Sequence, residues 1–168
     1  GGVGGSQKAV RKGIDALSPS AVIMVGIAFG INEQKQAIGD VLVSERLMLY
    51  DLQRVGTDQE GNLEIIPRGD RPHASPWLIN RLQVANLTWD EPKAKVRFGL
   101  ILSGDKLADN IDFRGQLLKF EPEAIGGEME GAGMYVASHD KKVDWVLVKA
   151  ICDWADGQKA VSYTHLTL

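Results

Sequence analysis

Residues 21–30 read AVIMVGIAFG, an apolar run that ends in a turn containing two glycines. The first five residues form a short, continuous stretch rich in branched side chains. Such a stretch is typical of a strand buried on both faces of an α/β sheet. Ligands of open α/β sheets bind beyond the carboxyl ends of the strands. This segment therefore predicts a central strand followed by a candidate binding turn.

Strands and helices alternate along the rest of the chain. Apolar runs predict strands at residues 41–50, 95–103, 124–125 and 143–152, and helical spacing predicts helices at residues 7–17, 76–85, 112–120 and 131–138. In the first helix, Ala9, Val10, Gly13 and Leu17 are predicted to share one face. Residues 51–76 are polar and interrupted by Gly and Pro, which predicts a long loop. The alternation indicates a three-layer α/β domain.

Composition excludes several classes of protein. The chain has 168 residues, 44% of them hydrophobic, and a net charge of −3, which fits one globular domain with a core and gives no electrostatic footprint for nucleic acid or anionic lipid. No apolar run approaches the roughly 20 residues that span a bilayer. The single cysteine, Cys152, cannot form an internal disulfide, so we expect a reducing, cytoplasmic location.

Four segments place chemically versatile residues next to these elements. Gly26–Gly30, Ser103–Asp105 and Cys152–Asp156 follow strands, and Gly127–Gly131 opens a helix. Each segment also has a purely structural explanation. Glycines permit tight turns, aspartates cap helices, and carboxylates at a helix start complement its dipole. Both interpretations, a ligand contact and a purely structural role, therefore stay open at this point.

Other site chemistries do not fit the sequence. His73, His139 and His165 have no metal-ligand spacing with Cys152, and neither a G-x-S-x-G elbow nor a G-K-[ST] phosphate loop is present. Cys152 is interpreted as a small buried hydrophobe rather than a nucleophile. We predict no metal and no cofactor.

Taken together and in order, five segments resemble the nucleoside phosphorylase superfamily, and among its branches the 5′-methylthioadenosine/S-adenosylhomocysteine nucleosidases. The segments are Val25–Gly30, Gly39–Ser44, Ser103–Asp105, Glu128–Gly131 and Lys149–Asp153. The resemblance implies a three-layer αβα nucleoside phosphorylase-like fold with a central mixed sheet, here truncated. It covers residues 1–160, and the tail at residues 161–168 is predicted not to be native to this domain.

The resemblance also implies a reaction, cleavage of the N-glycosidic bond between a purine and a ribose. Asp153 matches the acid that protonates the departing purine, and Glu130 matches the glutamate that binds the ribose hydroxyls. Met129 is expected to pack on the sugar, and Glu128 to position this motif. The remaining residues implied to contact substrate are Ile27, Ala28, Phe29, Gly30, Leu107 and Ala108.

The attacking group can be water or phosphate. Met24 stands where the hexameric purine phosphorylases have an arginine, and a buried Met cannot bind phosphate. This favours hydrolysis, of an adenine nucleoside such as 5′-methylthioadenosine or S-adenosylhomocysteine. Phosphorolysis stays open, because Arg68 and Arg71 in the long loop can bind an anion.

Several positions depart from the family pattern. In the family, a strand that ends in glycine and glutamate supplies the residue that activates water, and no such strand precedes Val22 here. The helix expected after Asp153 is also missing, and Lys149 replaces an arginine. These departures predict a truncated nucleosidase domain, which would be a homodimer or higher homo-oligomer when intact. Two alternatives are a catalytically inactive nucleoside-binding module, favoured by Ile27 and Phe29 narrowing the site, and an α/β fragment whose motifs serve turns and caps.

Overall fold

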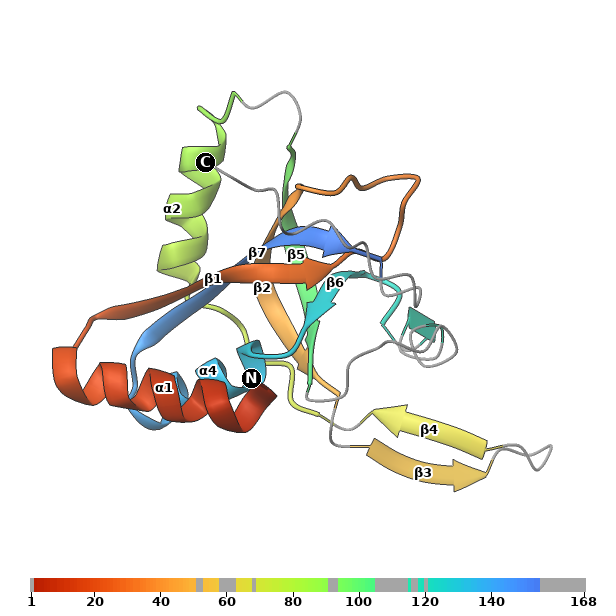
Figure 1. The fold of residues 1–168 in the computed structure, drawn as a ribbon, viewed down its shortest axis with the longest axis horizontal. Coiled ribbons are helices and arrows are strands. Elements are labelled where there is room, and N and C mark those ends of the chain that lie inside the picture. Colours follow the sequence, from red (N-terminus) through yellow and green to blue (C-terminus); the bar gives the residue numbers. More distant parts are fainter. Residues whose placement is uncertain are drawn as a thin grey trace.

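The computed structural model describes residues 2–50, 53–57, 63–67, 69–90, 94–104, 115, 118–119 and 121–154. Within these ranges lie three long helices and seven strands (Figure 1). The helices are α1 (Gly2–Leu17), α2 (Pro76–Asn86) and α4 (Gly131–Asp140). The strands are β1 (Ala21–Phe29), β2 (Val41–Leu49), β3 (Gln53–Thr57), β4 (Leu63–Pro67), β5 (Val96–Ser103), β6 (Ala124–Glu128) and β7 (Asp144–Asp153).

Five of the strands form a mixed sheet that curls into a closed barrel in the order β1-β6-β5-β2-β7. β1 and β7 are parallel, as are β2 with β5 and β5 with β6, whereas β2 runs antiparallel to β7. The barrel closes through one antiparallel pair, Phe29 with Gly127. The predicted mixed α/β fold with a central mixed sheet is therefore confirmed.

The helices cover the barrel from different sides. α1 packs on α4, and α4 in turn contacts β7, β1 and β2, whereas α2 packs on β7 and β2 away from that pair (Figure 1). Apolar side chains from these elements form the main core. Its largest fully buried members include Leu42, Leu47, Ile101, Met134 and Leu147.

Three predictions about individual elements are wrong. Residues 51–76 are not a continuous loop, because β3 and β4 pair there as an antiparallel hairpin. β6 is longer than predicted, and it ends at Glu128, so this residue closes a strand before α4 begins. β1 is not buried on both faces, since Ile23, Val25 and Ile27 are 53%, 75% and 55% exposed. The predicted helix at residues 112–120 lies largely outside the described residues.

Asp40 ties the segment after β1 to the strands that follow. Its carboxylate accepts hydrogen bonds from the backbone N–H groups of Ala37 and Lys95 and from Nε of Arg97, at 2.7–3.1 Å. Burial opposes ionisation of this carboxyl, but the three hydrogen bonds outweigh it and lower its pKa below the ordinary value. The Asp40 carbonyl also accepts from Ile151 N–H, 2.9 Å away, which anchors this turn beside the end of β7.

The face by which α1 packs agrees with the predicted one only in part, since Val10 and Gly13 are half-buried but the other two predicted residues are not. Ala9 and Leu17 are exposed, whereas Ile14 is buried and Val10 and Ser6 are half-buried. Ser6 Oγ donates a 2.8 Å hydrogen bond to the carbonyl of Glu130, which joins α1 to the start of α4. The packing face therefore combines apolar positions, Val10 and Ile14, with a polar contact of Ser6 to the partner helix.

Gly133 makes the close approach of α1 and α4 possible. A Cβ atom at this position would lie 2.1 Å from Ser6 Oγ and 2.2 Å from the Val3 carbonyl oxygen. We expect Gly133→Ala to push the helices apart and to lower the free energy of unfolding by about 1–3 kcal/mol. Urea unfolding followed by circular dichroism measures this change.

Gly13→Ala is the matched control for that variant. Gly13 also lies within a helix, but a Cβ there meets nothing within 4 Å. Since alanine is the better helix former, we expect Gly13→Ala to raise the free energy of unfolding by up to about 1 kcal/mol. Equal effects of the two substitutions would contradict the packing argument.

Candidate functional site

The register of the sheet brings four strand ends together. Phe29, at the end of β1, pairs with Asp153 of β7 on one side and with Gly127 of β6 on the other. β6 in turn pairs with β5, Ser103 opposite Glu128. Segments more than 100 residues apart in the sequence therefore meet at one end of the barrel, as expected of strand ends in this class of fold.

Glu128 is buried and serves the start of α4. Its side chain, 1% exposed, accepts hydrogen bonds from the N–H groups of Glu130 (2.9 Å) and Gly131 (2.9 and 3.0 Å). Ser103 Oγ accepts a further bond from Ala132 N–H at 2.8 Å. Because the first N–H groups of a helix have no partners within it, these two side chains satisfy donors that burial would otherwise leave unpaired.

Lys149 is the cation of the site. Its side chain, 3% exposed, projects from the middle of β7, and Nζ lies 3.1 Å from Oε2 of Glu128 and 3.0 Å from Oε2 of Glu130. Gly26 on the paired strand leaves the necessary space, since a Cβ there would lie 3.0 Å from Nζ. The sequence analysis noted Lys149 only as the replacement of an arginine, although a charged residue within an apolar run is a signal by which this role could have been found.

The two carboxylates of the Glu128–Glu130 segment therefore differ in environment. Glu128 is engaged by backbone donors and by Lys149, whereas the side chain of Glu130 is 40% exposed and its one ion pair is with Lys149 among the described residues. Met129 between them is half-buried. Of the two carboxylates, Glu130 is the one placed to meet a ligand.

Asp153 ends β7 in a half-buried position. Its carbonyl accepts a 2.9 Å hydrogen bond from Gly30 N–H, and its Oδ2 lies 3.2 Å from Cys152 Sγ. The Trp154 ring packs over Gly30, where a Cβ would come within 2.5 Å of it. Gly30 is therefore required for the approach of β7 and the residue after it, beyond any part in ligand contact.

The predicted binding turn divides into two environments. Ala28 and Phe29 are buried, and the Phe29 ring lies against Gly127, where a Cβ would come within 2.2 Å. Ile27 is 55% exposed and belongs to the exposed face of β1. Phe29 therefore closes the barrel, and Ile27 does not line the same space.

Other predicted residues have different outcomes. Leu107 and Ala108 lie outside the described residues, as do Asp105 and Arg68. Arg71 is paired with Glu121, its Nε 2.8 Å from Oε1. The sequence analysis did not predict the capping role of Ser103 or the contact of Cys152 with Asp153. The first contact joins residues 29 positions apart, and the second depends on the direction of two side chains, so neither follows from a local pattern.

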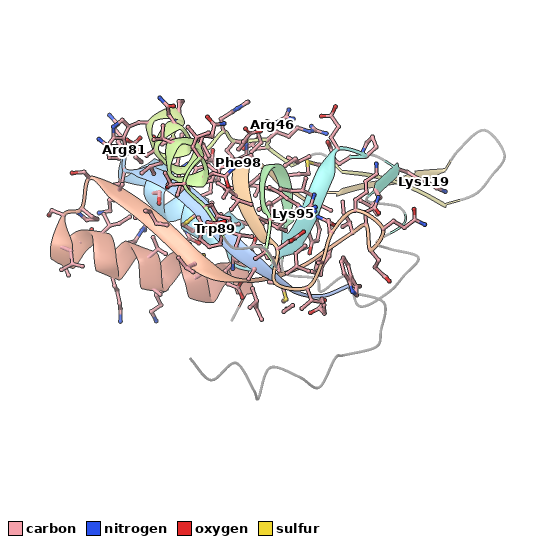
Figure 2. The ribbon with its side chains drawn as sticks, turned by 90° about the horizontal axis from the view of Figure 1, so that it is seen from above. Arg46, Arg81, Trp89, Lys95, Phe98 and Lys119 are labelled. Carbon is pink, nitrogen blue, oxygen red and sulfur yellow. The ribbon has the colours of Figure 1, made fainter. Side chains whose placement is uncertain are left out.

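A hollow of about 600 Å³ lies on the barrel. Its lining includes Lys35, Arg97, Phe98 and Ile125, from the segment after β1 and the starts of β5 and β6. Phe98 precedes Ser103 by five residues, about 16 Å along a strand at roughly 3.3 Å per residue. In Figure 2, Lys95 and Phe98 lie between Arg81 on α2 and Lys119. The lining also includes Ile31 and Asn32, which directly follow Gly30, so the hollow extends from the start of β5 to the segment after β1.

The described residues contain neither a metal-ligand cluster nor a membrane-spanning helix. Among those residues, no three His, Cys, Asp or Glu side chains are grouped so that they could hold a metal ion. No helix there is long and apolar enough to cross a membrane.

The architecture and these strand-end residues define a class of protein. The Phosphorylase superfamily profile matches residues 1–167, and the chain belongs to this family. The chain is 31% identical to a Death domain-containing ATP nucleosidase of Amphimedon queenslandica, over 92% of the chain and 32% of that protein. It is 27% identical to a 5′-methylthioadenosine/S-adenosylhomocysteine nucleosidase of Staphylococcus epidermidis, over 89% of the chain and 64% of that protein.

Solved structures agree with this assignment. The chain superposes with a TM-score of 0.78 on the 5′-methylthioadenosine/S-adenosylhomocysteine nucleosidase of Neisseria meningitidis, crystallised with methylthio-immucillin-A. The two are 25% identical, and the match covers 97% of this chain and 69% of that one. The S-adenosylhomocysteine nucleosidase of Streptococcus pyogenes, at 23% identity and a TM-score of 0.76, has the same fold. The chain thus spans about a third and about two thirds, respectively, of the two curated relatives named above.

Proposed function

We propose that the intact protein to which this chain belongs hydrolyses the N-glycosidic bond of an adenine nucleoside and releases adenine. The observation that carries the proposal is the strand register at one end of the barrel, where Phe29 of β1 pairs both with Asp153 of β7 and with Gly127 of β6, three residues before Glu130. Membership of a family whose curated relatives are named nucleosidases supports the same reaction.

The chemistry assigns a role to each of these groups. A purine anion is a poor leaving group, so an acid must protonate it as the bond breaks, and Asp153 is the proposed donor. The ribose develops oxocarbenium character, as in other glycoside cleavages. Glu130, held by Lys149, is proposed to accept hydrogen bonds from the ribose hydroxyls, with Met129 against the sugar. No residue of this chain is proposed as the base that activates water.

The candidate substrates differ in the group attached at the 5′ position of adenosine. Nucleosidases of the staphylococcal type are named for 5′-methylthioadenosine and S-adenosylhomocysteine, whereas the relative from Amphimedon queenslandica is named for ATP. All three are adenosines modified at the 5′ position. We propose 5′-methylthioadenosine or S-adenosylhomocysteine as substrate, and ATP as the second candidate, favoured by the relative with 31% identity.

Chromatography of adenine released from each of the three compounds tests the proposal. Incubation with and without inorganic phosphate distinguishes the nucleophile, because phosphorolysis needs phosphate and produces ribose 1-phosphate derivatives. We expect adenine without phosphate. Strict dependence on phosphate would make the protein a phosphorylase, and binding of all three compounds without turnover would make it a nucleoside-binding module.

Three further proposals concern organisation. The intact protein is proposed to be cytoplasmic, supported by the single cysteine of this chain, and to form a homodimer or larger homo-oligomer. Residues 1–160 are proposed as the domain and residues 161–168 as a tail foreign to it. Light scattering during size-exclusion chromatography measures the oligomeric state, and a monomer would contradict the second proposal.

A further inference from the structure

The end of β7 departs from regular strand geometry. Ala28 pairs with Ile151 but Phe29 pairs with Asp153, so Cys152 is the extra residue of a β-bulge. In a regular strand, neighbouring side chains point to opposite faces, whereas a bulge re-aims them. The bulge accounts for a contact between chain neighbours, Cys152 Sγ with Asp153 Oδ2 at 3.2 Å.

Cys152 enters this contact as a protonated thiol. Burial, followed by the hydrogen bond and the charge of Asp153, raises the pKa of the thiol to about 12. The group is therefore a hydrogen-bond donor at neutral pH and not a nucleophile. Its two available acceptors are Oδ2 of Asp153 at 3.2 Å and the Ala28 carbonyl oxygen at 3.5 Å.

We infer that Cys152 is a positioning residue for Asp153, which restrains the carboxyl through a thiol hydrogen bond to Oδ2. The inference rests on the proposed function, in which Asp153 protonates the departing purine. No bond to sulfur forms or breaks, and the thiol keeps its proton throughout the reaction.

The neighbouring contacts make this restraint effective. The Asp153 carbonyl is held by Gly30 N–H at 2.9 Å, so the backbone of the residue is fixed against the turn after β1. The thiol contact to Oδ2, at 3.2 Å, then acts on the side-chain torsion of Asp153. Proton transfer depends strongly on placement, because a donor must lie within hydrogen-bond reach of the atom that it protonates.

The test is the dependence of kcat on pH in the intact protein carrying Cys152→Ala or Cys152→Ser. Cys152→Ala removes a hydrogen-bond donor to the Asp153 carboxylate and so destabilises its ionised form. The pH above which kcat falls should therefore move to a higher value, and kcat itself should be reduced roughly three- to tenfold. A hydroxyl is a stronger donor than a thiol. Cys152→Ser should therefore retain kcat within about threefold and move that limb to lower pH.

Asp153→Asn, measured alongside, separates the two possible failures. If Asp153→Asn keeps full activity, the role of Asp153 and with it the proposed function are wrong. If Asp153→Asn is inactive while both Cys152 variants keep the wild-type pH profile, the function stands and the positioning role is wrong. Should Cys152→Ala fail to fold, an unchanged profile in Cys152→Ser alone still overturns the inference.

Discussion

Asp153→Asn is expected to lower the rate of adenine release by the intact protein about 10²- to 10⁴-fold, which is the usual contribution of a general acid. Asparagine has the shape of aspartate but cannot supply a proton to the purine. The substitution leaves the fold intact, because the Asp153 contact to Gly30 N–H uses the backbone carbonyl and an amide oxygen still accepts from the Cys152 thiol. The loss should therefore appear in kcat rather than in KM.

Asp144→Asn is the control, since Asp144 is an exposed carboxylate at the opposite end of the same strand. It should change neither kcat nor KM by more than about twofold. Stopped assays by chromatography cover the whole range of rates. A variant Asp153→Asn that turns over as fast as the wild type would exclude Asp153 as the acid, and another proton donor would have to be found.

Lys149→Met is expected to lower the free energy of unfolding of the chain by about 3–5 kcal/mol, the usual cost of removing one partner from a buried ion pair. Methionine fills much of the space of lysine but leaves the Glu128 carboxylate, 1% exposed, without its ammonium group at 3.1 Å. Glu130 loses its ion pair as well. We therefore also expect a higher KM for the nucleoside in the intact protein, because Glu130 is the proposed ligand of the ribose.

Lys141→Met is the matched control on the surface. Lys141 Nζ lies 2.6 Å from Asp15 Oδ1, but the two side chains are 39% and 52% exposed. Surface ion pairs contribute little, so the free energy of unfolding should change by less than about 1 kcal/mol. Urea unfolding compares the two variants directly, and equal small effects would contradict the burial argument.

The double variant Lys149→Met/Glu128→Gln provides a second test. Removing both charges leaves no unpaired ion at this pair, so part of the stability lost in Lys149→Met should return. The amide side chain introduced by Glu128→Gln would still offer an oxygen to the N–H groups of Glu130 and Gly131. A double variant less stable than either single one would show that the Glu128 charge matters for α4 more than for Lys149.

The order of elements could be predicted well from local pattern. The strands at residues 41–49 and 96–103 and the helix at residues 76–86 lie within a residue or two of their predicted bounds. Period and length are local properties, and they decide such elements. The hairpin of β3 and β4 was missed, since its polar and Gly-rich surroundings resemble a loop and the pairing of two short strands is a tertiary property.

The candidate site was predicted as a set of segments, not as a geometry. The residue pattern shows Glu128 and Glu130 as two carboxylates beside one methionine, and only the family resemblance gave them different roles. The structure separates them, because β6 extends to Glu128 and buries it under α4, whereas Glu130 begins the helix with its side chain partly in solvent. The three residues by which β6 exceeds its predicted bounds thus decide which carboxylate caps the helix and which is left partly exposed to solvent.

The sequence by itself determined that this chain is a mixed α/β domain of the Phosphorylase superfamily, since motif order and hydrophobic period are written along the chain. Only the tertiary structure decided that Lys149 lies beside Gly26 of the neighbouring strand and between two carboxylates. It also decided that the Cys152 side chain contacts that of Asp153. Both arrangements depend on strand register, and the second depends on a bulge. Register results from the pairing of segments more than 100 residues apart, for which no local pattern exists.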